Sequence, residues 1–284
     1  MSAENKTIKA GVIGWPIEHS LSPRLHCYWL REYGIDGVYD AHPVKPEDAA
    51  AFIRGLAGDG PGGGFAGINV TVPHKETAFS CVDEMDDFAK RVGAVNTIVV
   101  GADGKLIGSN TDGFGFMESL KSGVPGWEAA QGPVTVIGAG GAARAIVTAL
   151  LDAGAPLLRL VNRTGDRAQS LAAEIGGPVE VVPWEKRTAA LKEAALLVNT
   201  TTLGMAGAPP LDLDLGNLPD SCLVTDIVYA PLITPLLAAA AERGNVTVDG
   251  IGMLLHQARP GFRQWFGVEP TVTPAQRTFV LEAQ

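Results

Sequence analysis

Two hydroxyl side chains in the segment 14–23 suit the binding of a small carboxylate. Ser20 and Ser22 lie two residues apart, and Pro23 follows directly. This order predicts a helix with Ser22 as its N-cap and Pro23 at the first helical position. Hydroxyls beside free backbone N–H groups favour an anion. Plain helix capping is the simpler interpretation of Ser22 taken alone.

A lysine follows the next polar strand end. In Asn-Val-Thr-Val-Pro-His-Lys, residues 69–75, alternation places Asn69 and Thr71 on one face of a strand. Pro73 ends this strand and opens a predicted helix with Lys75 in its first turn. A positive charge there opposes the helix dipole, which favours loss of the proton and suits Lys75 to proton transfer. Taken alone, Lys75 reads as an exposed surface lysine.

Two further polar segments, 93–97 and 108–113, contain Asn96 and Asp112. Thr111 or Asp112 can act simply as the cap of a helix running toward Leu120. In a functional reading, the carboxylate of Asp112 near Lys75 orients the amine and tunes its affinity for a proton. Whether these two side chains meet is left open by the sequence.

Residues 133–145, Pro-Val-Thr-Val-Ile-Gly-Ala-Gly-Gly-Ala-Ala-Arg-Ala, read as a strand, a glycine turn and a helix start. Gly138 permits the tight turn, Gly140 lets the backbone approach a pyrophosphate, and the small Ala143 allows close packing of helix on strand. Free N–H groups at the helix start then bind the diphosphate. The alternative is a glycine turn that only packs a strand–helix unit.

The strand after this turn indicates which dinucleotide binds. It ends in Asn162, some 24 residues after Gly138, where an NAD-specific protein usually carries an acid for the ribose 2′-hydroxyl. Arg163 and Arg167 follow at a predicted helix start, a position electrostatically unfavourable for cations. An amide beside two guanidinium groups accepts a 2′-phosphate, which predicts NADP. Ordinary solvated arginines are the alternative.

The elements that position these residues alternate between short apolar runs and helix-like stretches, which predicts an α/β protein with a parallel sheet covered on both faces. Turn residues between Leu120 and Pro133 indicate that a second unit starts near Pro133. After about Leu237 the pattern becomes helical, over 250–266 and 274–283. The predicted strands are residues 10–14, 38–41, 68–72, 95–100, 134–137, 157–161, 179–182, 196–198 and 223–227.

The composition excludes several classes of function. The 284 residues, 46% apolar and 19% charged, suffice for two domains with a sizeable core. A net charge of −9 without a basic block disfavours nucleic acid and anionic membranes as partners. Cys27, Cys81 and Cys222 have no metal-ligand spacing and no disulfide framework. With a polar start and no long apolar run, the sequence predicts a cytoplasmic protein without a metal.

A glycine-rich run at residues 57–64 is not expected to bind phosphate. It contains no lysine, and it leads into a strand-like segment where a phosphate loop requires a helix. A flexible surface loop is the predicted role.

Together these segments resemble the shikimate dehydrogenase family, which includes shikimate and quinate dehydrogenases. The likeness runs nearly end to end. It also covers Asn-Thr-Thr-Thr-Leu-Gly-Met at 199–205, Asp-Ile-Val-Tyr-Ala-Pro-Leu-Ile-Thr-Pro-Leu at 226–236 and Asp-Gly-Ile-Gly-Met-Leu-Leu-His-Gln-Ala at 249–258. The resemblance implies a reversible NADPH-dependent reduction of 3-dehydroshikimate to shikimate, in chorismate and aromatic amino acid biosynthesis.

The resemblance also implies an organisation into domains. An α/β substrate-binding and catalytic domain spans 1–112, and a Rossmann-type NADP-binding domain spans 113–237. C-terminal helices at 238–284 return to pack on the first domain. The expected assembly is a monomer or a homodimer.

The family further implies a role for particular residues. Lys75 and Asp112 form the catalytic pair. Ser20 and Ser22 bind the substrate carboxylate, while the ring hydroxyls contact Thr71, Asn96, Asp112, Tyr229 and Gln257. The residues that hold NADP are Gly138, Ala139, Gly140, Gly141, Ala142, Asn162, Arg163, Thr164 and Arg167, and those that approach it are Asp87, Ile227 and Gly250.

Three other functions remain open at this point. An NAD-dependent quinate/shikimate dehydrogenase is the nearest, although Ser22 and the segment 162–164 point away from it. A non-catalytic ligand sensor of the same fold is the second, although it need not retain both Lys75 and Asp112. Methylenetetrahydrofolate dehydrogenase is third, because two serines suit a carboxylate better than a pterin.

Overall fold

The structure is a computed structural model that describes residues 7–58 and 63–282. Its chain divides into two compact units: Met1–Thr111 with Gln257–Gln284, and Asp112–His256. The predicted C-terminal segment 238–284 is therefore divided, because residues up to His256 belong to the second unit. Residues 59–62 of the glycine-rich run lie outside the described residues.

The first unit contains a six-stranded sheet in the order β2-β1-β3-β5-β6-β4. Its strands are β1 (Ile8–Gly14), β2 (Gly37–Pro43), β3 (Gly67–Val70), β4 (Glu84–Met85), β5 (Thr97–Val100) and β6 (Leu106–Ser109). β1 runs parallel to β2 and β3, but β5 is antiparallel to both β3 and β6. The expectation of a parallel sheet is wrong here, because the short connection 101–105 permits only a hairpin.

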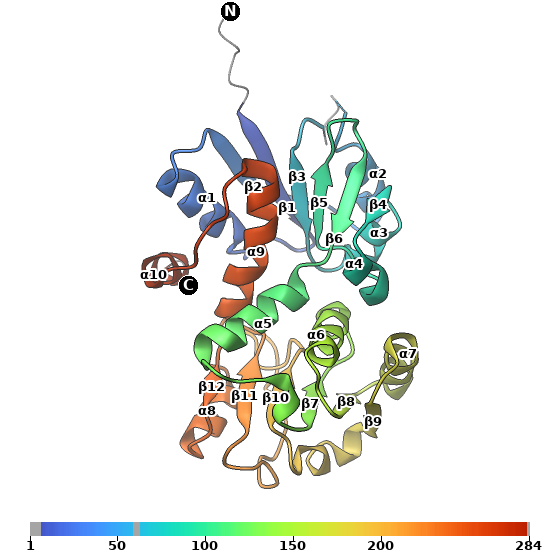
Figure 1. The fold of residues 1–284 in the computed structure, drawn as a ribbon, viewed down its shortest axis with the longest axis vertical. Coiled ribbons are helices and arrows are strands. Elements are labelled where there is room, and N and C mark those ends of the chain that lie inside the picture. The colour runs from blue at the N-terminus through green and yellow to red at the C-terminus, as the bar shows by residue number, and fades with distance from the viewer. Residues whose placement is uncertain (1–6, 59–62, 283–284) are drawn as a thin grey trace, which may run out of the picture. The chain divides into compact units, whose positions relative to one another are not determined.

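Helices cover both faces of this first sheet (Figure 1). One face packs against α2 (Ala49–Arg54), α3 (Lys75–Phe79) and α4 (Asp87–Val92), which share a buried core with β3 and β5. On the other face lie α1 (Ser22–Glu32) and residues 257–266 of α9 (Ile251–Phe266). The indole of Trp265 donates to the carbonyl of Ile98 at 3.0 Å and fills the space above Gly67.

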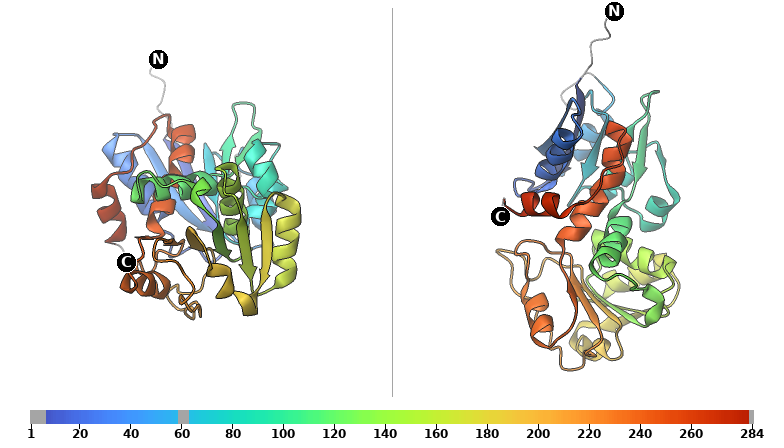
Figure 2. Two further views of the ribbon diagram at one scale, coloured as in Figure 1. Left: turned by 60° about the horizontal axis from the view of Figure 1, so that its bottom comes forward. Right: turned by 60° about the vertical axis from the view of Figure 1, so that its left-hand side comes forward.

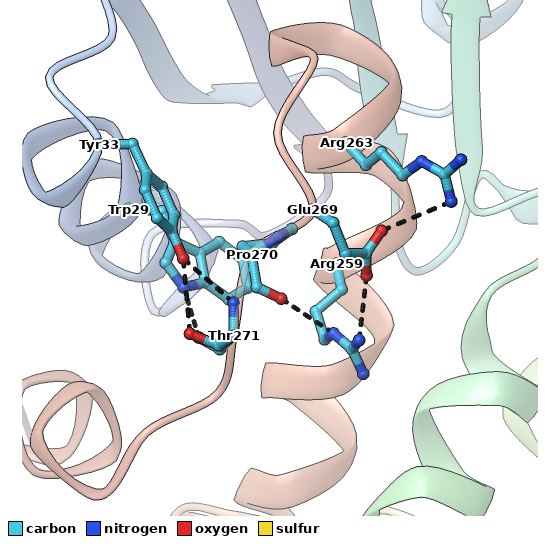
Figure 3. A network of polar contacts seen from close by, with 7 residues as sticks. All are labelled: Trp29, Tyr33, Arg259, Arg263, Glu269, Pro270 and Thr271. Carbon is cyan, nitrogen blue, oxygen red and sulfur yellow. Dashed lines mark hydrogen bonds and ion pairs between the residues drawn. The ribbon is translucent and has the colours of Figure 1, made fainter.

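The C-terminal residues are anchored to the first unit, as predicted for the helices that return to it. Between α9 and α10 (Pro274–Leu281), Thr271 accepts a 3.0 Å hydrogen bond from the indole of Trp29. Its backbone N–H donates to the hydroxyl of Tyr33 at 3.2 Å. Arg259 pairs with Glu269 at 3.0 Å, so the turn after α9 is held at both ends (Figure 3).

The second unit contains a six-stranded parallel sheet in the order β12-β11-β10-β7-β8-β9. Its strands are β7 (Val134–Ile137), β8 (Leu158–Asn162), β9 (Val179–Pro183), β10 (Leu196–Asn199), β11 (Leu223–Asp226) and β12 (Thr247–Val248). Numbered within this unit, the order is 3-2-1-4-5-6 read from the β9 edge, which is the order of dinucleotide-binding folds. The strand order reverses between β7 and β10, where such folds bind their ligand.

The helices of the second unit are α5 (Asp112–Gly123), α6 (Gly141–Asp152), α7 (Gly165–Ile175), α8 (Pro235–Glu242) and the first residues of α9. α7 lies beside β8 and β9 (Figure 2). Thr234 caps α8 by accepting from the N–H of Leu237, with Pro235 at the helix start. No helix in the described part of the chain is both long and apolar enough to cross a membrane.

The second unit starts earlier than its turn residues indicate. Phe116 and Leu120 of α5 are buried in the same core as Ile146 and Leu150 of α6. This packing assigns α5 to the second unit. The turn residues between Leu120 and Pro133 connect α5 to β7, and the boundary lies at Asp112, next to the predicted position 113.

Candidate active site

The serine-containing loop differs from its predicted form in one respect. α1 begins at Ser22, and its N-cap is Leu21, which makes no capping hydrogen bond with its side chain. The prediction that Ser22 is the N-cap is therefore wrong, because the backbone of Leu21 is already helical and the helix starts one residue early. Ser20 Oγ instead accepts from the N–H of Ser22 at 3.3 Å.

This loop lies against the end of β3. The N–H of Trp15 donates to the carbonyl of Val72 at 3.1 Å, and that of Thr71 donates to the carbonyl of Ile13 at 2.9 Å. A Cβ atom on Gly14 would lie 2.6 Å from the Cγ2 of Thr71, so only glycine permits this approach. The structure thus brings Gly14 and Trp15, at the start of the serine-containing segment, beside Thr71 and Val72.

Lys75 is the first residue of α3 and is half-buried. Its carbonyl accepts from the N–H of Val95 at 3.0 Å, which attaches the helix start to the predicted polar segment 93–97. The preceding His74 is buried, with its Nε2 2.7 Å from the carbonyl of Val44. These contacts fix the backbone that carries the candidate proton donor.

Asn96 joins three segments of the first unit. Its Nδ2 donates to Thr111 Oγ1 at 3.0 Å and to Gln257 Oε1 at 3.4 Å. Its Oδ1 accepts from the N–H of Thr111 at 2.8 Å. Asn96 and Gln257, two of the predicted substrate contacts, are therefore neighbours although 161 residues separate them in sequence.

Asp112, the predicted partner of Lys75, directly follows Thr111. It is the first residue of α5 and is only 5% exposed, and the start of a helix favours its negative charge. The backbone of Lys75 is bonded to Val95, and that of Thr111, the residue before Asp112, is bonded to the neighbouring Asn96.

Three residues of this hydrogen-bonded group, Tyr39, Asn69 and Thr97, are not among the predicted site residues. The hydroxyl of Tyr39 donates to Asn69 Oδ1 at 2.6 Å, and Asn69 Nδ2 donates to Thr97 Oγ1 at 3.0 Å. The strand alternation that pairs Asn69 with Thr71 was a signal for Asn69. Thr97 belongs to the predicted polar segment 93–97, in which only Asn96 received a role, and Tyr39 gives no such signal.

The glycine turn of the second unit has the expected conformation. Gly138 has a φ of +114°, and a Cβ atom there would collide with Thr200 Oγ1 at the end of β10. Ala143 is fully buried in the core against the sheet, as predicted for the third position. At Gly140 and Gly141 a Cβ atom would meet nothing within 4 Å, which leaves that side of the turn open.

The start of α6 can receive an anion. Gly140 is its N-cap, has an extended backbone and supplies no side-chain cap. The first N–H groups of this twelve-residue helix therefore lack a side-chain acceptor at the point where the strand order reverses. A pyrophosphate fits such a site, because it supplies the missing acceptors and favours the positive end of the dipole.

The predicted 2′-phosphate site lies at the end of β8. Asn162 Nδ2 donates to the carbonyl of Thr164 at 2.8 Å, which shapes the turn into α7. Arg163 and Arg167 are exposed, and neither has an ion-pair partner within 7–58 or 63–282. Arg144 of the same unit, by contrast, is paired with Glu174.

The other expected cofactor and substrate contacts of the second unit follow β11 and β12. The N–H of Ile227 donates to the carbonyl of Asn199 at 3.1 Å, and a Cβ atom on Gly250 would lie 2.5 Å from the carbonyl of Val228. Burial raises the pKa of Asp226, which accepts from Asn199, Val228 and Thr234.

Two of the predicted contacts lie in a different unit from their expected partners. Tyr229 belongs to the second unit, whereas Asn96 and Gln257 belong to the first. Burial raises the pKa of the Tyr229 phenol. Asp87 belongs to the first unit, whereas the glycine turn belongs to the second. Asp87 is exposed and pairs with Lys90 at 2.9 Å, which lowers the pKa of its carboxyl group.

Family models match both units. Residues 12–98 match the shikimate dehydrogenase substrate binding domain, and residues 121–205 match the shikimate/quinate 5-dehydrogenase model. The chain is 58% identical over 272 residues to the shikimate dehydrogenase (NADP(+)) of Paramagnetospirillum magneticum. This alignment covers 96% of this chain and 97% of that protein.

Solved structures agree with these matches. Shikimate 5-dehydrogenase from Thermus thermophilus, in complex with NADP(H) and shikimate, is 36% identical with a TM-score of 0.85, covering 98% of this chain and 100% of that chain. Quinate dehydrogenase from Corynebacterium glutamicum, in complex with NAD, is 31% identical with a TM-score of 0.87, covering 97% and 99%. With identity of this extent over nearly its whole length, the chain belongs to the shikimate dehydrogenase family.

Proposed function

We propose that this protein catalyses the reversible reduction of 3-dehydroshikimate to shikimate with NADPH, a step of chorismate and aromatic amino acid biosynthesis. The observation that carries the proposal is the 58% identity, over 96% of the chain, to a shikimate dehydrogenase (NADP(+)). The buried amides and hydroxyls around Asn96 are suited to a polyhydroxylated ring, since each can pair with a ring hydroxyl.

The first unit supplies the proposed substrate contacts. Ser20 and Ser22 bind the carboxylate, and Thr71, Asn96 and Gln257 bind ring hydroxyls. The support for this assignment is that Asn96 and Gln257 are hydrogen-bonded and that Gly14, at the start of the serine-containing segment, lies against Thr71. Tyr229 of the second unit completes the proposed set.

The second unit supplies the proposed NADP contacts. Gly138, Ala139, Gly140, Gly141 and Ala142 hold the pyrophosphate at the start of α6. Asn162, Arg163, Thr164 and Arg167 hold the 2′-phosphate through charge-assisted hydrogen bonds. Ile227 and Gly250 of the same unit and Asp87 of the first unit approach the cofactor. When bound, NADPH supplies the hydride for the carbonyl carbon.

Lys75 and Asp112 carry out the proposed proton transfer. The ammonium of Lys75 donates a proton to the alkoxide oxygen that forms as the carbonyl is reduced, and it takes the proton back in the reverse direction. The carboxylate of Asp112 orients the amine and stabilises its charged form. The burial of Asp112 supports this role, because it strengthens the electrostatic interaction.

The NAD-dependent quinate/shikimate dehydrogenase remains the nearest second candidate, since a quinate dehydrogenase in complex with NAD shares the fold. Arg163 and Arg167 favour NADP, because an NAD-specific site has no 2′-phosphate for them to bind. A cytoplasmic location and a monomeric or homodimeric state complete the proposal. Support for the location comes from Cys27, Cys81 and Cys222, which are free thiols.

Nicotinamide absorbance tests the proposed activity directly. We expect the purified protein to reduce NADP with shikimate, at a kcat/KM at least about tenfold above that with quinate or with NAD. A preference for NAD or quinate would transfer the assignment to the second candidate. No turnover with any of the four pairs would indicate a non-catalytic relative.

A further inference from the structure

A chain of hydrogen bonds crosses the first unit from β2 to α9. It starts at Tyr39, passes through Asn69 and Thr97 to Asn96, and ends at Gln257. Tyr39, Asn69, Asn96 and Thr97 are all at most 5% exposed. Each donor and acceptor therefore depends on its neighbours in the chain, because little water is available to replace them.

Two backbone groups fix the direction of donation along this chain. Asn69 Nδ2 lies 3.2 Å from the carbonyl of Asn96, which can only accept. Asn69 Oδ1 must therefore face Tyr39, whose hydroxyl is the donor. The N–H of Thr111 lies 2.8 Å from Asn96 Oδ1 and can only donate. Asn96 Nδ2 must therefore face Gln257, which presents its Oε1.

Thr97 transmits this direction between the two amides. Its hydroxyl accepts from Asn69 Nδ2 at 3.0 Å, so its own proton is directed to Asn96 Oδ1, also at 3.0 Å. If Asn69 turned over, its oxygen would face the carbonyl of Asn96. The Thr97 proton would then be drawn to Asn69, and Asn96 Oδ1 would lose a donor.

Aromatic packing holds Tyr39 in place. Its ring stacks on the imidazole of His26, with centroids 3.8 Å apart and planes 2° apart, and Trp265 lies 6.1 Å away. Burial raises the pKa of Tyr39, so the phenol stays protonated and remains a donor. The hydroxyl is thereby directed at Asn69.

We propose that Tyr39 is a positioning residue for substrate recognition: by donating to Asn69 it stabilises, through Thr97, the orientation that the two backbone groups give the Asn96 and Gln257 amides. This inference rests on the proposed function, which makes Asn96 and Gln257 substrate contacts. The orientation of each amide determines whether a substrate hydroxyl must donate or accept there, so Tyr39 acts on specificity without touching the substrate.

The test is Tyr39→Phe, which removes the hydroxyl and retains the aromatic packing. We expect KM for shikimate to rise about 3- to 10-fold, the equivalent of one hydrogen bond, while KM for NADP stays within twofold. The matched control is Tyr33→Phe in the same unit. The hydroxyl of Tyr33 contacts Thr271 and takes no part in the hydrogen-bond chain from Tyr39 to Gln257 (Figure 3). This control should leave both KM values unchanged.

A second pair of variants keeps the inference testable if Tyr39→Phe does not fold. Thr97→Val removes the transmitting hydroxyl, and Thr97→Ser retains it. We expect KM for shikimate to rise with Thr97→Val and to rise much less with Thr97→Ser. A purely structural role would lower Tm in both without this difference.

The outcomes separate this inference from the proposed function. If the wild-type protein does not oxidise shikimate, the proposed function fails. If it does, and Tyr39→Phe and Thr97→Val both keep the wild-type KM for shikimate, only the role of Tyr39 is overturned. An equal rise in KM for shikimate and for NADP would also overturn it, because that pattern indicates general destabilisation.

Discussion

The imidazole of His26 stacks face to face on the phenol of Tyr39, with ring centroids 3.8 Å apart. His26 is fully buried, and neither of its ring nitrogens has a hydrogen-bond partner among the described residues. A neutral imidazole tolerates this site far better than a charged one, so burial lowers the pKa of His26 to about 3 from its usual value of 6.5.

We expect the free energy of unfolding to decrease less steeply with falling pH in His26→Phe than in the wild type. Between pH 6.5 and about 3 the unfolded chain binds a proton that the folded protein excludes. The wild-type free energy of unfolding therefore falls as pH falls, by up to about 1.4 kcal/mol per pH unit from this group. Urea unfolding at pH 7, 6, 5 and 4 measures the free energy of unfolding of both proteins. If it fell equally with pH in both, the prediction would be wrong.

Replacement of Lys75 by Ala should lower kcat by a factor of about 10² to 10⁴, with a much smaller change in KM for shikimate. The reason is that the variant lacks the proton donor for the alkoxide. Steady-state kinetics with NADP provide the measurement. Lys105→Ala is the control, because Lys105 is exposed and paired with Glu84. Wild-type turnover in Lys75→Ala would refute the assignment.

Arg163→Ala should raise KM for NADP about 10- to 100-fold and leave KM for NAD within twofold, because only NADP carries the 2′-phosphate. Added salt should reduce the difference in KM for NADP between the wild type and Arg163→Ala, because it screens the charge of the arginine. Arg243→Ala in the same unit, where Arg243 pairs with Asp220, is a control expected to change neither value. A parallel loss of NAD affinity would place Arg163 elsewhere in the cofactor site.

Gly138→Ala should destabilise the protein by at least about 2 kcal/mol and abolish NADP binding. The substitution combines a strained positive φ with a collision at Thr200. Gly165→Ala serves as its control for stability, because a Cβ atom there meets nothing within 4 Å. Urea unfolding compares the two variants, and cofactor titration measures NADP binding by Gly138→Ala; equal stability of the two variants would show that the turn relaxes.

Much of the fold follows from local patterns in the sequence. Each predicted strand coincides with a strand of the structure, because every one is an apolar run of adequate length. β4, β6 and β12 are not among the predicted strands; β4 and β12 contain only two residues each, which carry no periodic signal. The hairpin of β5 and β6 makes the first sheet mixed, which alternation of strands and helices does not reveal.

The candidate site was predictable where one short segment carries several functional groups. The glycine turn and the Asn162–Arg163 pair are of this kind, because the backbone conformation and the charge lie within a few residues. The contact of Asn96 with Gln257 joins the residue before β5 to α9 across 161 residues, and only the family resemblance indicated it. Tyr39 remained unassigned because its meaning depends on partners from other strands.

The first unit is discontinuous in sequence, and this affects the order in which a ribosome can complete the two halves of the protein. Residues 112–256 emerge as one uninterrupted stretch and hold all their core partners. Residues 7–111 lack Trp265, which covers Gly67, until the last part of the chain has been synthesised. A nascent chain stopped before residue 257 therefore carries a cofactor half able to close its core and a substrate half still open to solvent.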